Sequence, residues 1–183
     1  MSAAAIRRAT IEDAATLGLL QVAAWRETYT DLFPQSALAA LDADEEAHAC
    51  GGLLQEAEID PARATFLLCD EAGEPAGYCA CERQRVERLE RGGFASDIIA
   101  LYLLRHVQRQ GFGRRLMQAA AAHLLAQGLS SASVWVFRDN PQACRFYEAL
   151  GGERTGVDGD WTVLGVTPAD ISFGWRDLRT LRA

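Results

Sequence analysis

The residues best suited to chemistry form the segment QRQGFG at 108–113, which separates an apolar run at 97–104 from a helix-like pattern at 114–127. This order predicts a strand, a tight glycine loop and a helix. Gly111 and Gly113 have no Cβ, so the backbone there can adopt positive φ and a bulky ligand can approach its N–H groups closely. A helix that begins after such a loop points unpaired N–H donors and the positive end of its dipole at one place. The segment therefore predicts a phosphate or pyrophosphate site.

A glycine pair before a helix is also common in turns that bind nothing, and on the glycines alone that interpretation has equal weight. The flanking residues narrow the choice. The spacing is not the GxGxxG of a dinucleotide fold, and the segment lacks the Gly-Lys-Ser/Thr ending of a nucleoside-triphosphate loop. The pattern is instead QxxGxG, which requires a second motif for its interpretation.

That second motif lies at 134–151, where a buried strand precedes a helix with both ends marked. Asn140 is a favourable N-cap and Pro141 suits the first helical position. Gly151 suits a left-handed C-terminal cap. The two segments, in this order, resemble the GNAT superfamily of acetyl-CoA-dependent N-acetyltransferases, and two motifs are more specific than one.

The resemblance implies an α/β fold with a mixed, mostly antiparallel central sheet flanked by helices. With 183 residues, the chain is long enough for one domain with a sizeable core and short for two. We therefore expect a single N-acetyltransferase domain over residues 1–183.

The resemblance also implies that acetyl-CoA is the co-substrate. The backbone at 101–103 would bond the pantetheine arm like an added strand, and the 108–114 loop would hold the pyrophosphate. Physical chemistry agrees, because a strand edge offers N–H and C=O groups to an amide-bearing ligand and a helix start offers donors to an anion. A free N–H, such as that of Leu103, would stabilise the developing oxyanion. The implied cofactor-binding residues are Leu101, Tyr102, Leu103, Gln108, Arg109, Gln110, Gly111, Phe112, Gly113, Arg114 and Asn140.

Two residues take catalytic roles by the same resemblance. Transfer to an amine requires a neutral nucleophile, although an amine with a pKa of about 10.4 is almost wholly protonated at pH 7. Asp97 matches a position where several family members carry a glutamate base, and it could act through water. Tyr147 matches the usual acid for the departing thiolate. The alternatives are a solvated acid at a strand start for Asp97 and a core tyrosine for Tyr147.

Three positions depart from the family pattern. Gln110 replaces a frequent Lys or Arg, so the charge of the pyrophosphate must be met by the backbone or by nearby arginines. Arg105 stands where Pro is common, and Gly152 stands where Phe is common.

The acceptor side is expected near the aromatic and charged segment at 25–34. Trp25 and Tyr29 are the candidate substrate-binding residues, because this region forms part of the acceptor pocket in GNAT-like proteins. Aromatic residues that simply cap the core are an equal alternative. The acceptor itself, a small-molecule amine or a protein amino group, is not readable from the fold.

The composition excludes several classes of function. A net charge of −7 argues against nucleic acid as the main partner, and it suits a cationic amine. No apolar run reaches the roughly 20 residues that span a bilayer, and no secretory signal is evident, so we expect no membrane association and a cytoplasmic location. The five cysteines show no ligand spacing, which predicts neither disulfides nor a metal site; Cys79 and Cys81 should share one face of a strand.

The remaining elements follow from periodicity and punctuation. We expect a short strand at 6–8, a capped helix from Ile11, and an interrupted helix at 35–57 that breaks at Gly51-Gly52. Further along, the sequence predicts a hairpin at 65–82, a poorly ordered loop at 83–96, and late strands at 154–157, 162–166 and 171–175. The late strands could pair with a second copy to form a homodimer.

The sequence thus predicts an N-acetyltransferase that works by direct attack, since no Cys or Ser has a recognisable activating partner. A non-catalytic acyl-CoA-binding sensor is the alternative from another class. A nucleotide-binding regulator would require ATP or NAD to outcompete CoA.

Overall fold

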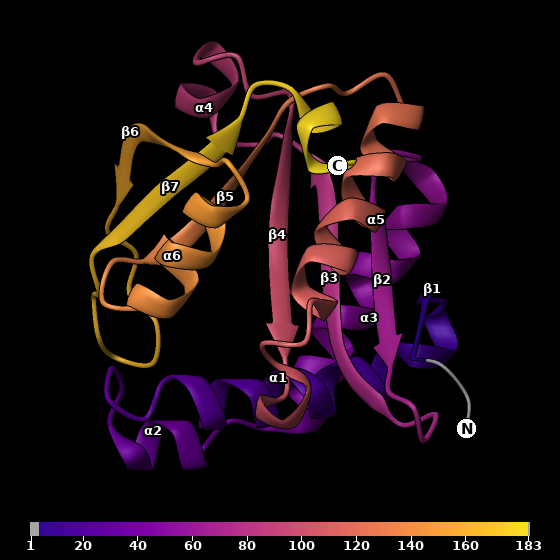
Figure 1. Ribbon diagram of the computed structural model, residues 1–183. Helices are drawn as coiled ribbons and strands as arrows, with labels where there is room; N and C mark the ends of the chain where they lie inside the picture. Colours follow the sequence, from indigo (N-terminus) through magenta and orange to yellow (C-terminus); the bar gives the residue numbers. More distant parts are fainter. Residues whose placement is uncertain (1–3, 183) are drawn as a thin grey trace.

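A computed structural model describes residues 4–182, and its centre is a seven-stranded sheet in the order β1-β2-β3-β4-β5-β7-β6 (Figure 1). Neighbouring strands are antiparallel except for β4 and β5, which are parallel. The predicted mixed, mostly antiparallel sheet is therefore confirmed. The strands are β1 Ala5–Arg8, β2 Ala64–Cys69, β3 Pro75–Arg83, β4 Ser96–Leu103, β5 Ala132–Phe137, β6 Glu153–Gly159 and β7 Asp170–Trp175.

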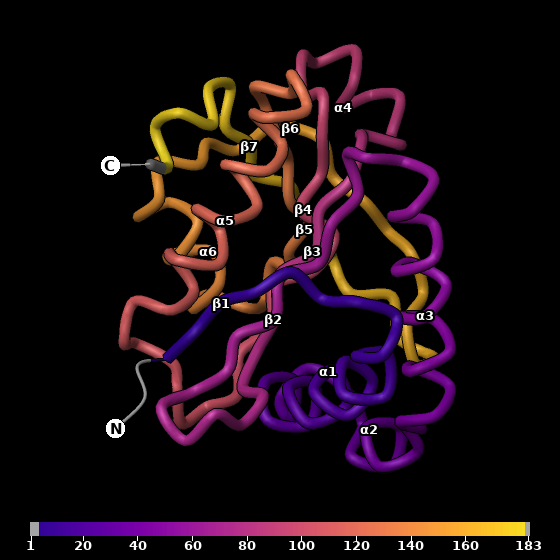
Figure 2. Tube along the Cα trace, turned by 90° about the vertical axis from the view of Figure 1, so that its right-hand side faces the viewer, coloured from indigo at the N-terminus to yellow at the C-terminus, as the bar shows by residue number. Residues whose placement is uncertain are grey.

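Helices cover both faces of the sheet (Figure 2). The α5 face carries α5 and α6, whose apolar residues pack on the sheet with Cys79 and Cys81, both buried on this side as predicted. The α1 face carries α1 and α3, with Leu17 and Leu54 packed against Tyr78 of β3. The helices are α1 Ala14–Thr28, α2 Gln35–Ala39, α3 Ala43–Ile59, α4 Glu87–Arg91, α5 Phe112–Ala126 and α6 Pro141–Ala149.

The sheet opens between its two parallel strands. β4 pairs with β5 only from Ser96 to Ile98, and beyond that point the strands diverge (Figure 1). A register shift against β3 leaves Ile99 out of the ladder, as a bulge at the point where the gap begins. Among the described residues, the β4 edge at 99–103 therefore has no strand partner on the side of β5.

The first helix begins where its capping residues predicted. Thr10 and Asp13 form a capping box around a short 3₁₀ turn, η1 (Ile11–Asp13), and α1 follows directly. Arg7 adds two hydrogen bonds to the Asp13 carboxylate, at 2.7 and 2.6 Å. These contacts fix the chain as it leaves β1.

The predicted break at Gly51-Gly52 is wrong, because α3 runs through both glycines. α3 packs along α1, and a Cβ on Gly18 of α1 would lie 2.5 Å from the Ala47 nitrogen and the Ala43 oxygen. This close packing outweighs the roughly 1 kcal/mol that a glycine costs inside a helix.

Two further predictions about local structure are wrong. The stretch 83–96 contains α4, which is anchored by buried Leu89 and followed by buried Phe94. Residues 162–166 form a tight turn with one bridge between Val163 and Val166 rather than a strand. The polar residues of 83–96 show no pattern that predicts a helix, so α4 was not expected. The β-branched residues of 162–166 are typical of a strand, although they lie in a turn. No helix within 4–182 has the length and apolar character needed to cross a membrane.

Candidate active site

The gap between β4 and β5 brings the sequence-predicted residues to one place. On one side lies the unpaired edge of β4 with Leu101, Tyr102 and Leu103. The Leu103 carbonyl already accepts a hydrogen bond from Gln108 Nε2 at 2.9 Å. The glycine loop is thereby tied to the end of the strand, so the strand edge continues into the loop.

The loop bends sharply into α5. Gly111 is the N-cap with φ 86°, and Arg109 also has a positive φ, 61°. The first hydrogen bond into the helix runs from the Arg115 N–H to the Gly111 carbonyl at 3.1 Å, so the N–H groups of the first three helical residues lack helical acceptors. These free donors and the helix dipole suit an anion, so the phosphate site stays a prediction that this geometry permits.

Gly113 serves a different purpose from Gly111. It lies inside α5 without a positive φ, and a Cβ there would be 3.1 Å from the Phe146 ring of α6. Its lack of a side chain therefore lets α5 and α6 approach each other. The positive φ that glycine permits is used at Gly111 and not at Gly113.

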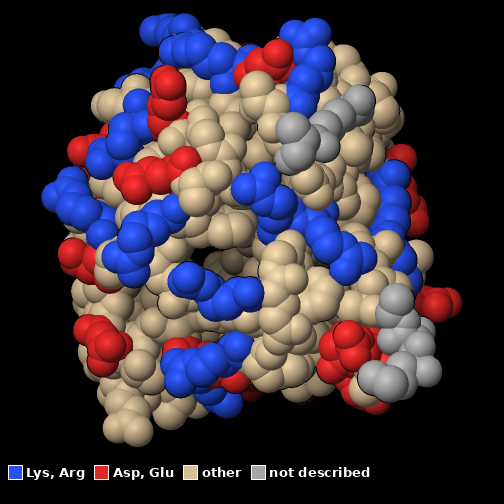
Figure 3. Space-filling view, viewed as in Figure 1, with Lys and Arg blue, Asp and Glu red and all other residues tan. Residues whose placement is uncertain are grey.

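Arginine side chains supply positive charge near the loop. Arg109 and Arg114 are exposed, whereas Arg115 donates to the Ala4 carbonyl at 3.1 Å and turns away. Gln110 donates to the His106 carbonyl at 2.8 Å. All 18 basic residues of the chain are arginines. Figure 3 shows such side chains around a hollow in the middle of the face that carries α5 and α6.

The second motif closes the other side of the gap. The Asn140 Oδ1 atom accepts from the Ala143 N–H at 3.1 Å, which caps α6 as predicted. Gln142 of α6 donates to Gln108 Oε1 at 2.9 Å and so links α6 to the loop. The two motifs are in direct contact across the gap.

Tyr147 lies on the face of α6 that is turned toward the sheet. Its side chain is 6% exposed, and its ring packs against Phe173 and Trp175 with centroids 6.1 and 6.0 Å apart. Burial raises the pKa of the Tyr147 hydroxyl, so the group stays protonated at neutral pH. Tyr147 belongs to the core on the α5 face, with Ile98 and Phe173, whereas Asp97 precedes Ile98 and bonds Ser133 on the α1 face. The two predicted catalytic side chains therefore lie on opposite faces of the sheet.

Asp97 lies at the closed end of the gap, and sequence reasoning missed the residues that hold it. Ser133 Oγ donates to Asp97 Oδ1 at 2.7 Å, and Gln84 Nε2 donates to Ser133 Oγ at 2.7 Å. Burial raises the pKa of Asp97 to about 6, the Ser133 hydrogen bond lowers it, and the charge of Glu82 raises it further. Asp97 is buried, so the alternative of a solvated acid at this position is wrong.

Trp25 and Tyr29 project from the end of α1 toward the gap. Their rings lie 4.9 Å apart, and both pack against Phe137 of β5, at 6.2 and 5.3 Å. Burial raises the pKa of the Tyr29 hydroxyl, while the nearby Asn140 side chain acts in the opposite direction. The aromatic residues thus connect the α1 face with the second motif.

The model of the acetyltransferase (GNAT) family matches residues 22–152, in agreement with this geometry. The chain belongs to the GNAT family. YuaI, an uncharacterized N-acetyltransferase of Bacillus subtilis, is 32% identical over 177 residues, which cover 97% of this chain and 95% of YuaI. The family predicted from the two motifs is confirmed, and with it the assignment as an acyltransferase.

Solved GNAT structures share the fold at low sequence identity. The PaiA N-acetyltransferase of Thermoplasma acidophilum, in complex with coenzyme A, gives a TM-score of 0.74 at 16% identity over 94% of this chain and 98% of that one. YncA of Salmonella typhimurium, in a structure with acetyl-CoA, gives a TM-score of 0.68 at 16% identity over 97% of this chain and 95% of that one. The predicted GNAT fold is confirmed.

Two departures from the GNAT pattern have structural causes. The Arg105 N–H donates to Glu27 Oε2 at 2.6 Å, and its guanidinium donates to the Glu27 carbonyl at 2.6 Å. A proline at 105 could not make the first bond. At Gly152, a Cβ would lie 2.9 Å from the Trp175 ring, which fills the space and donates from Nε1 to the Leu150 carbonyl at 2.9 Å.

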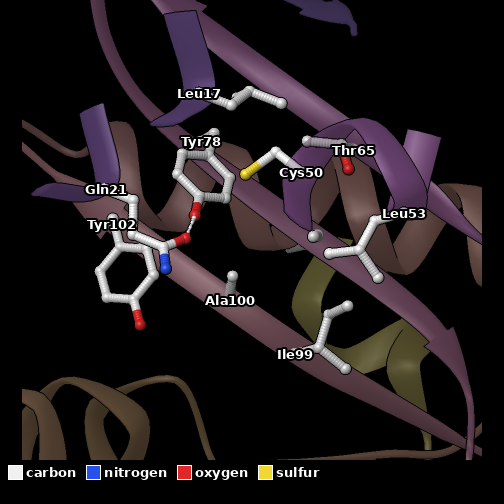
Figure 4. Close-up of a pocket in the computed structure, with 10 residues that line it drawn as sticks. Leu17, Gln21, Cys50, Leu53, Thr65, Tyr78, Ile99, Ala100 and Tyr102 are labelled. Atoms are coloured by element: carbon white, nitrogen blue, oxygen red, sulfur yellow. Dashed lines mark hydrogen bonds between the residues drawn. The ribbon is translucent and has the colours of Figure 1, made fainter. Parts of the chain in front are cut away.

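A cavity of about 200 Å³ adjoins the β4 bulge on the α1 face (Figure 4). The Tyr78 hydroxyl donates to Gln21 Oε1 at 2.5 Å, while the hydroxyl of Tyr102 points away from this pair. Ile99 and Ala100 of the bulge form another part of the wall. This GNAT chain therefore has free space on both sides of the unpaired β4 edge.

Proposed function

We propose that this protein is an N-acetyltransferase that moves an acetyl group from acetyl-CoA directly to a primary amine. The observation that carries the proposal is the gap between β4 and β5. It combines an unpaired strand edge, free N–H donors at the start of α5, and two buried titratable residues. Relatives named as N-acetyltransferases and structures solved with coenzyme A or acetyl-CoA support it.

The residues fit a long anionic co-substrate that contains amides. The β4 edge at 101–103 would pair with the pantetheine amides, as a strand does. The N–H groups at 111–114, with Arg109 and Arg114, would hold the pyrophosphate. Gln108 keeps loop and strand together, and Asn140 holds the start of α6 beside them.

Acetyl-CoA, when bound, supplies an activated acetyl group and a thiol leaving group. Asp97 accepts a proton from the incoming ammonium through water, which gives the neutral amine. As the new C–N bond forms, a free N–H of the β4 edge stabilises the charge on the acetyl oxygen. As the C–S bond breaks, the Tyr147 hydroxyl gives its proton to the departing sulfur. The attacking nitrogen loses one further proton on becoming the amide, and this proton returns Tyr147 to its neutral hydroxyl form.

A panel of primary amines with acetyl-CoA tests this function, with CoA release measured by chromatography. Chromatography is preferable to a thiol reagent because Cys69 and Cys144 are partly exposed. Amine-dependent CoA release is the expected result. Tight acetyl-CoA binding without turnover on any amine would instead support the non-catalytic sensor.

A further inference from the structure

Asp170, the first residue of β7, is a buried carboxylate that the proposed mechanism does not use. Its side chain is 2% exposed, yet it takes part in no ion pair among residues 4–182. Burial raises the pKa of Asp170 to about 6, and the nearby Trp161 side chain offsets part of the rise. A carboxylate kept in such a place without a cationic partner carries a large desolvation cost.

Strand register places Asp170 on the α1 face. It is the partner of Phe137 across β5 and β7, so the two side chains project to the same side of the sheet. Phe137 packs against Tyr29, with ring centroids 5.3 Å apart. Beyond the effect of burial, the charge of Asp170 adds to the rise in the pKa of both the Tyr29 and Tyr102 hydroxyls. Asp170 therefore faces the acceptor side of the gap.

Two tryptophan side chains lie near Asp170. Trp161, which is 49% exposed, lies at the rim with its ring 5.3 Å from that of Trp135. A Cβ on Gly159 would lie 3.1 Å from the Trp135 ring and 3.5 Å from the Asp170 Cβ, so Trp135 and Asp170 are neighbours. A carboxylate among aromatic faces is suited to an ammonium group, because the ring quadrupoles add to the attraction of the charge.

The reacting amine and this site are separate. Asp97 of β4 is the register partner of Ser133 of β5, and Asp170 of β7 is the register partner of Phe137 of β5. Four residues along a strand span roughly 13 Å. One small ammonium group cannot contact both carboxylates at that separation.

We propose that Asp170 binds a second cationic group of the acceptor, which selects diamines over monoamines. The inference rests on the proposed acetyl transfer at the β4–β5 gap. Asp97 serves the amine that is acetylated, and Asp170 with Tyr29 and Trp161 holds the other end. The unpaired charge of Asp170 is then compensated only when such an acceptor is bound.

The test compares α,ω-diamines of three to eight carbons with monoamines of the same carbon number. Steady-state kinetics give KM, and calorimetry on the CoA-bound protein gives Kd without turnover. We expect at least one diamine to bind at least tenfold more tightly than its monoamine. Asp170→Asn should abolish that preference and leave monoamine KM and acetyl-CoA affinity unchanged, while Asp170→Glu, which keeps the charge, should retain part of it.

Asp160→Asn is the matched control, because Asp160 is an exposed acid of the same β6–β7 connection and should not affect the preference. Equal binding of diamines and monoamines by the wild type overturns the inference without any variant. An equal loss of diamine and monoamine affinity in Asp170→Asn also overturns the inference. If diamines bind in an Asp170-dependent way but no amine is acetylated, the proposed function fails and the binding site stands.

Discussion

Tyr147 has the most specific chemical role of any single residue in this chain. Tyr147→Phe preserves the ring packed on Phe173 and Trp175 and removes only the hydroxyl. If the hydroxyl protonates the leaving sulfur, kcat should fall about 10²–10⁴-fold, while the acetyl-CoA Kd moves little. Kinetics and thermal melting on the same variant decide the role. A variant that loses about 0.5–1.5 kcal/mol of stability and keeps full kcat would make Tyr147 a core residue.

The burial of Asp97 should affect both the pH dependence of activity and the pH dependence of stability. Below a pH of about 6 the carboxylate binds a proton, so wild-type kcat/KM should fall with decreasing pH, and Asp97→Asn should lose both this limb and most of kcat. A pH–rate profile of both proteins checks this. A wild-type profile that is flat from pH 5 to 7 would contradict the role of base.

Ionised Asp97 is needed for activity in this account, but it should lower the stability of the folded protein at neutral pH. Its folded pKa, about 6, exceeds the unfolded value of 3.8, so its contribution is fully present below pH 3.8 and is lost as the pH rises through about 6. Asp97→Asn should therefore raise the free energy of unfolding at pH 7, by up to about 3 kcal/mol. Denaturant unfolding at pH 4 and pH 7 measures this, and a variant that is less stable than wild type at pH 7 would refute it.

At the scale of elements, the start of α5 should bind CoA largely through charge. Arg109→Ala with Arg114→Ala should raise the CoA Kd by up to roughly 30-fold, because exposed charge pairs are worth up to about 1 kcal/mol each. The effect should shrink in high salt. Calorimetry measures it, and Arg91→Ala, an exposed arginine of α4, is the matched control. Equal Kd values for the double variant and the control would remove these arginines from the site.

The contact between α1 and α3 offers a paired test of packing. Gly18→Ala places a Cβ 2.5 Å from the α3 backbone and should destabilise the protein by about 1–3 kcal/mol. Gly52→Ala, in α3 with nothing within 4 Å of the added Cβ, should stabilise it by up to about 1 kcal/mol. Melting of both variants tests the close approach of α1 and α3. Equal shifts would show that the helices do not approach so closely.

Sequence reasoning succeeded where the signal is local. The capping box at Thr10, the loop at Gly111 and the cap at Asn140 each depend on a few adjacent residues. It failed where distant packing decides, as at Gly51-Gly52 and in α4. Ser133 and Asp170 were missed because only strand register shows which residues face them, and register cannot be read from one strand.

At the scale of the whole molecule, the sequence contains no lysine, which simplifies the search for an acetylated protein. All 18 basic residues are arginines, so the chain offers no lysine side chain for acetylation by its own co-substrate. A net charge of −7 then coexists with arginines around the hollow of the α5 face (Figure 3). The two faces of the gap therefore differ, with arginines near the proposed CoA side and buried carboxylates on the proposed acceptor side.

Direct transfer is the central claim, and intact-protein mass spectrometry after rapid mixing with acetyl-CoA tests it most directly. Without lysine side chains, a covalent acetyl-enzyme would appear against a clean background. Direct attack predicts an unchanged protein mass with acetyl-CoA alone, and equal amounts of CoA and N-acetylated amine once an acceptor is added. An acetylated protein that passes its acetyl group to the amine at the rate of turnover would contradict the claim.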